Sequence, residues 1–85
     1  MDLVFISNQI KYDILHICGL PVEHSYNLLT NTSLKAIGYH DDERCRQLEE
    51  KLHMVAQEYN TGKSVAKGDV SENLTVRQCI QLVIS

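Results

Sequence analysis

The tripeptide Gly62-Lys63-Ser64 matches the end of a phosphate-binding P-loop, whose backbone N–H groups wrap the phosphates while the lysine reaches them. The complete motif has another glycine five residues before the second one, and this chain has Gln57 there. The motif also follows a strand, whereas the residues before Gly62 have the apolar spacing of a helix. We therefore expect residues 62–64 to form a polar loop and not a nucleotide site.

Four histidines and three cysteines supply side chains that bind zinc. His16 stands near Cys18 and His24, and His40 stands near Cys45. A structural zinc site needs four convergent ligands, and the sequence has no Cys-x-x-Cys or His-x-x-x-His pair. We expect no metal ion and no other cofactor, so a small ligand or metal binder is only the third alternative for the function.

Cys45 is the cysteine best placed for nucleophilic chemistry, because Arg44 and Arg46 flank it and a nearby cation lowers the pKa of a thiol. Cys45 also begins an apolar row with helical spacing, where a small buried side chain is the ordinary occupant. The cysteines are three in number and lie in apolar segments, so we expect reduced, buried thiols and no disulfide. We expect no enzymatic activity.

Acidic residues flank the apolar row of the strongest predicted helix, which covers residues 42–59. Such a face is either solvated or presented to a basic partner, and the sequence leaves both alternatives open. The residues that we single out for interaction are Leu48 and Leu52 on the apolar row and Glu49, Glu50 and Glu58 on its flanks.

A helix-turn-helix would need Gly19 or Gly38 as its turn glycine and a basic helix after it. Acidic residues follow both glycines, and the eight basic residues of the chain are scattered among eleven acidic ones, with a net charge of -3. Binding to DNA phosphates usually requires a basic face. A nucleic-acid-associated transcriptional regulator is therefore the alternative function and not the leading one.

The elements that position these residues follow from apolar spacing and from stop signals. Helical spacing predicts helices over residues 3–17, 42–59 and 76–84, although the β-branched residues of the last segment also suit a strand. Gly19 and Pro21 end the first helix, and Pro21 begins a second one with Val22, Tyr26 and Leu29 on its buried side. A single short turn carries Leu34 and Ile37. Residues 60–73 read as a flexible connection.

The 85 residues form one domain, residues 1–85, since so short a chain supports a single core. We predict an all-α fold, a small bundle of four to five helices whose longest helix covers about 42–59. The predicted core residues are Leu3, Ile6, Ile10, Ile14, Ile17, Leu29, Leu48, Leu52, Val55, Ile80 and Val83.

The sequence has no basic segment before its first apolar run and no run long enough to cross a membrane, so we expect a cytoplasmic protein. A small helical domain without a catalytic motif favours a regulatory or adaptor protein that acts by binding another protein through its helix faces. The apolar row of residues 45–59 also offers a seam for self-association, and a homo-oligomer is expected.

Overall fold

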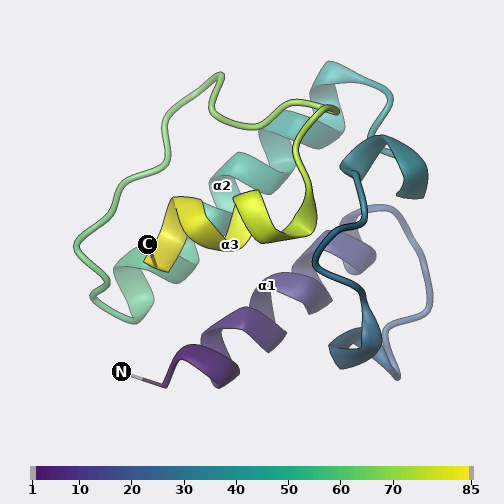
Figure 1. Ribbon diagram of the computed structural model, residues 1–85. Coiled ribbons are helices and arrows are strands. Elements are labelled where there is room, and N and C mark those ends of the chain that lie inside the picture. Colours follow the sequence, from purple (N-terminus) through teal and green to yellow (C-terminus); the bar gives the residue numbers. More distant parts are fainter. Residues whose placement is uncertain (1, 85) are drawn as a thin grey trace.

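The computed structural model describes residues 2–84. Its three α-helices are α1 (Leu3–Ile17), α2 (Asp42–Glu58) and α3 (Val76–Ile84), and the 3-10 turns η1 (Ser25–Asn27) and η2 (Leu34–Ile37) lie between α1 and α2. Each α-helix contacts the other two, and a long connection leads from α2 round to the start of α3 (Figure 1). The all-α prediction is confirmed, and the prediction that residues 76–84 form a helix is correct.

The predicted number of four to five helices is wrong, because residues 22–29 form only the turn η1. Tyr26 and Leu29, which we expected on a buried face, are 56% and 67% exposed. A short helix is stabilised mainly by burying an apolar face, and this segment packs Leu28 against the core only partly buried while Tyr26 and Leu29 face solvent. Apolar spacing alone therefore did not produce a helix after Pro21.

Polar caps start the first two helices. Asp2 Oδ1 accepts a hydrogen bond from the N–H of Phe5 at 3.1 Å, and Asp41 Oδ1 accepts one from the N–H of Arg44 at 2.8 Å. Each bond satisfies a backbone donor that has no partner inside its helix. These local bonds fix where α1 and α2 begin.

The start of α3 is held by two sets of partners. Thr75 and Gln78 form the reciprocal capping box that their spacing predicts, with bonds of 2.9 and 3.3 Å. The first two N–H groups of α3 donate to the carbonyls of Thr32 and Thr30, each at 2.9 Å. The connection before η2 is thereby fastened to α3. Ser33 and Thr75 also form an isolated antiparallel bridge, and no strand occurs within residues 2–84.

The core lies where the three helices meet. Of the predicted core residues, Leu3 is 52% exposed and Leu29 67% exposed, so both predictions are wrong. Ile17 and Ile80 pack against the core while only partly buried. The other predicted core residues are confirmed as buried, namely Ile6, Ile10, Ile14, Leu48, Leu52, Val55 and Val83.

Gly38 joins η2 to the start of α2. Its φ of +113° lies in the left-handed region, and an added Cβ would lie 3.4 Å from Arg44 Nη1 and 3.5 Å from Cys18 Sγ. Glycine is therefore favoured there by its backbone conformation, while the added Cβ would only come into contact with these two side chains. The turn directs Tyr39 into the core, where it is fully buried and its hydroxyl donates to the carbonyl of Ile14 at 2.6 Å.

None of the helices in residues 2–84 combines the length and the hydrophobicity needed to span a bilayer.

Candidate functional site

A row of polar side chains on α2 faces the connection to α3. The row consists of Asp42, Arg46, Glu49 and His53, whose spacing of four, three and four residues places them on one helix face. We call these four residues the α2 polar row. It lies beside the apolar row of Cys45, Leu48, Leu52 and Val55, which faces the core.

Glu49 is the centre of the α2 polar row. Its Oε2 accepts hydrogen bonds from the N–H groups of Gly68 and Val70 at 2.8 and 2.9 Å, and its Oε1 lies 2.7 Å from Arg46 Nε. Glu49 is only 4% exposed, although both alternatives for the acidic face, solvated or presented to a basic partner, place it on the surface. The expected exposure of Glu49 is wrong because the connection of residues 60–73 folds back over this side of α2.

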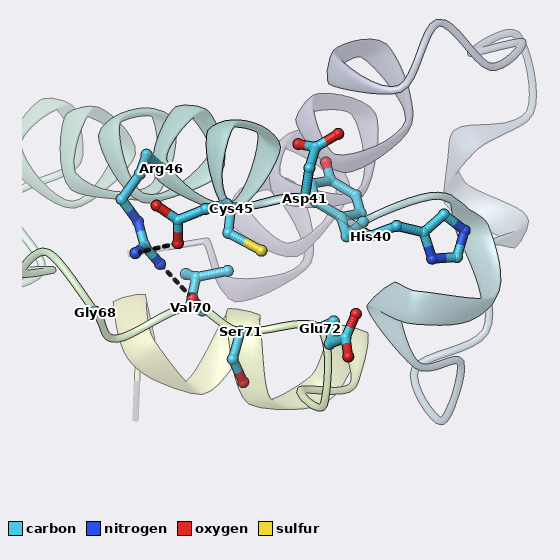
Figure 2. Close-up of a pocket in the computed structure, with 10 residues that line it drawn as sticks. His40, Asp41, Cys45, Arg46, Gly68, Val70, Ser71 and Glu72 are labelled. Atoms are coloured by element: carbon cyan, nitrogen blue, oxygen red, sulfur yellow. Dashed lines mark hydrogen bonds and ion pairs between the residues drawn. The ribbon is translucent and has the colours of Figure 1, made fainter.

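Arg46 holds the same connection from the other side. Its Nη2 donates to the carbonyl of Val70 at 2.6 Å, and its Nη1 donates to Asp42 Oδ1 at 2.9 Å (Figure 2). Nε pairs with the Glu49 carboxylate by charge but makes no hydrogen bond of good geometry within residues 2–84. Both terminal nitrogens of the guanidinium group are thus hydrogen-bonded within the chain, whereas Nε is held by charge alone.

His53 provides a third attachment, since its Nδ1 accepts a hydrogen bond from the N–H of Val65 at 3.2 Å. Val65 and Val70 are both buried, at 8% and 1% exposure. We call residues 65–70 the clamped segment. It is held by hydrogen bonds to Glu49 and His53 and by the burial of Val65 and Val70. Residues 60–73 contain no helix or strand, as the sequence indicates. The expected flexibility of this connection stays a prediction.

Two cavities open on either side of this attachment. The first has a volume of about 330 Å³ and is shown in Figure 2. Its buried lining residues are Tyr39, Cys45 and Val70, and its charged lining residues are Asp41, Asp42, Arg46 and Glu72. The second cavity, of about 390 Å³, is lined by Arg46, Glu49, Glu50, His53, Val65 and Lys67. We call them the Cys45 cavity and the His53 cavity.

The three thiols are free, as expected, but only Cys45 and Cys79 are buried. Burial raises the pKa of Cys18, Cys45 and Cys79, and it raises that of Cys79 to about 12. For Cys45 the nearby Arg46 guanidinium opposes the effect of burial without overcoming it. A raised pKa is the opposite of the shift that activates a cysteine nucleophile.

The predicted interaction residues are separated by the fold. Leu48 and Leu52 are fully buried against the chain's own helices, and Glu49 is buried under the clamped segment. Glu50 and Glu58 are exposed. Any self-association therefore uses a surface other than the Leu48–Leu52 seam.

The candidate metal ligands are not brought together. Within residues 2–84 no group of three or more histidine, cysteine or acidic side chains is placed to hold a metal ion. His16 stacks on Tyr12 with ring centroids 5.6 Å apart, and His24 packs edge-on against Tyr26. Lys63 and Ser64 of the P-loop-like tripeptide are exposed.

The first turn of α1 exposes a run of apolar side chains. Leu3, Val4 and Phe5 are 52%, 71% and 55% exposed. The Phe5 ring contacts that of Tyr59 at the end of α2 in an edge-on arrangement, with centroids 5.9 Å apart. We call these four residues the apolar end.

Among residues 2–84, Asp13 is the other buried charged residue, at 7% exposure. It lies on α1, and within the same residues its Oδ1 accepts a single hydrogen bond, from Gln9 Nε2 at 3.2 Å. Burial raises its pKa, and the Gln9 bond and the more distant Lys51 only partly oppose the shift. The carboxylate is thus poorly compensated in its charged form.

The sequence signal for the α2 polar row was its helical spacing beside the apolar row. The sequence predicted an exposed face, either solvated or presented to a partner, because nothing local says which residues will cover it. No protein-family model, curated protein or solved structure matches the chain.

Proposed function

We propose that this chain is a non-enzymatic binding protein that acts by contacting another protein through its helix faces. The observation that carries the proposal is the apolar end, where three consecutive apolar residues are each more than half exposed. Contiguous exposed apolar surface costs solvation free energy and commonly marks an interaction site. A regulatory or adaptor role is consistent with such a surface.

The test is site-specific photocrosslinking of the full chain. A photoreactive phenylalanine analogue replaces Val4 in the apolar end. A matched control replaces Leu29, which is similarly exposed, at 67% against 71%, but lies in the connection after α1. In lysate of the source cells we expect a discrete crosslinked product with a second protein at position 4 and none at position 29.

A competing variant makes the test specific. Leu3→Ser with Phe5→Ser should abolish the crosslink formed from position 4 while leaving the circular dichroism spectrum helical, since both side chains are largely solvent-exposed. A product containing only two copies of this chain would assign the apolar end to self-association. Equal, diffuse labelling from positions 4 and 29 would contradict the proposal.

A further inference from the structure

His53 accepts a hydrogen bond that only a neutral imidazole ring can accept. The donor is the backbone N–H of Val65, which lies 3.2 Å from His53 Nδ1. A backbone N–H is a donor only, so Nδ1 is the acceptor and the proton of the neutral ring is on Nε2. A proton on Nδ1 would place two N–H groups face to face, and the bond would be lost.

His24 shows why this constraint is particular to His53. Its Nδ1 lies 3.4 Å from the hydroxyl oxygen of Tyr26, and a hydroxyl group can either donate or accept. The contact of His24 can therefore persist when the ring gains a proton. Within residues 2–84, His53 is the histidine whose hydrogen bond to the backbone requires a neutral ring.

The other polar attachments of the clamped segment do not involve the imidazole. Glu49 accepts hydrogen bonds from the N–H groups of Gly68 and Val70. Arg46 donates to the carbonyl of Val70. These bonds remain when the His53 bond is lost, so the loss affects only the start of the clamped segment.

A closed turn separates the His53 bond from those attachments. The N–H of Ala66 donates to Asp69 Oδ2 at 2.8 Å, and the N–H of Asp69 donates to the carbonyl of Ala66 at 3.1 Å. Residues 62–64 before the turn are exposed. Without the His53 bond, Val65 is held to α2 only by its apolar contacts, and residues 62–65 are the part of the connection that becomes free to move.

The charged groups around His53 include both signs. Two cationic and two acidic side chains line the His53 cavity with it, namely Arg46 and Lys67, and Glu49 and Glu50. Arg46 and Glu49 pair with each other. Glu50 is exposed and lies one helical turn before His53 on α2, so its carboxylate can pair with an imidazolium ring that has turned away from Val65.

We propose that His53 is a pH-sensitive latch, whose neutral ring holds residues 62–65 against α2 and whose protonation releases them and opens the His53 cavity. Histidine is the side chain that ordinarily changes its charge between about pH 5 and pH 8. The stabilisation from the Val65 bond is present while the ring is neutral and is lost as the pH falls and the ring takes up a proton. The inference is independent of the proposed function, because the latch acts on the connection between α2 and α3 (Figure 1) and not on the apolar end.

The test is amide hydrogen exchange of the isotope-labelled full chain, followed by NMR from about pH 8 to about pH 5 and corrected for the intrinsic pH dependence of exchange. Protection of the Val65 amide should fall by about twofold to tenfold as His53 gains its proton, which is the range that the net free energy of one hydrogen bond gives. Protection of Gly68 and Val70 should stay constant. No change at Val65, or an equal fall at all three amides, would overturn the inference.

His53→Asn separates the latch from a general effect of acid. The side-chain oxygen of asparagine takes the place of Nδ1 as an acceptor and gains no proton in this pH range, so the pH response of Val65 should disappear. The matched control is His24→Asn, which removes a histidine whose contact does not require a neutral ring, and the response of Val65 should remain as in the parent. A response that persists in His53→Asn, or disappears in His24→Asn, contradicts the latch.

Discussion

Asp13 and Glu49 are the two buried charged residues within residues 2–84, and their surroundings differ sharply. Glu49 accepts two backbone N–H groups and pairs with Arg46, whereas Asp13 accepts one long bond from Gln9. Burying a carboxylate costs free energy that only hydrogen bonds and opposite charge offset. The carboxylate of Glu49 on α2 has this compensation, whereas that of Asp13 on α1 has little of it.

The comparison shows that burial by itself does not make a charged residue structural. Glu49 joins α2 to a segment that comes about twenty residues later in the chain, so its contacts hold tertiary structure together. Asp13 bonds within its own helix and secures no distant segment. Removing the charge should therefore lower the stability of the fold at Glu49 and raise it at Asp13.

The largest effect is expected for Glu49→Ala. The change leaves the N–H groups of Gly68 and Val70 and the Arg46 guanidinium without their carboxylate, and should cost about 2 to 4 kcal/mol of unfolding free energy. Glu50→Ala, on the exposed neighbour in the same helix, should change it by less than about 0.5 kcal/mol. Urea unfolding measures both, and hydrogen exchange should speed up at Gly68 and Val70 only in the first variant. Equal stability losses would contradict the central role of Glu49.

A smaller loss is expected for Val70→Ala. Val70 is 1% exposed, and its truncation removes two buried methyl groups. This should lower the free energy of unfolding by about 1 to 2 kcal/mol. In a Glu49→Ala background the same truncation should cost clearly less, because the clamped segment no longer holds Val70 against the core. A double-mutant cycle in urea measures this coupling. Additive losses would show that apolar packing alone places the segment.

The smallest effect on stability is expected for Asp13→Asn, and it is a gain and not a loss. Because the folded-state pKa of Asp13 is raised, the folded protein binds a proton more readily than the unfolded chain does. Its charged form therefore destabilises the fold above that pKa, and the penalty fades as pH falls toward about 4, the ordinary value for Asp. Asp13→Asn should raise the Tm at pH 7.

The pH dependence supplies the control for this variant. The difference in Tm between Asp13→Asn and the parent should shrink as the pH is lowered, since both then carry a neutral side chain at this position. Thermal melts followed by circular dichroism at several pH values measure it. A lower Tm for Asp13→Asn at pH 7 would mean that the charged Asp13 has partners stronger than Gln9 and Lys51.

Local signals in the sequence placed the helices well. The apolar row through Leu48 and Leu52 depends on neighbours within one or two turns. The same is true of the Asp41 cap and the Thr75–Gln78 capping box found in the structure. Such signals are readable because the interactions that they describe are local. The exception was the segment after Pro21, whose spacing suited a helix but whose Tyr26 and Leu29 face solvent.

The sequence alone determined the helical class, the helices over residues 3–17 and 42–59 and most of the core, because apolar periodicity acts over a few residues. It left residues 76–84 open between helix and strand, and it predicted four to five helices where the structure of residues 2–84 has three α-helices. Only the tertiary structure decided which polar flank of α2 would be covered, since Glu49 and Glu50 look alike until residues 65–70 fold over one of them. It also decided that Leu3 and Leu29 would face solvent. Burial of a particular side chain depends on segments far away along the chain, and spacing within one helix carries no information about them.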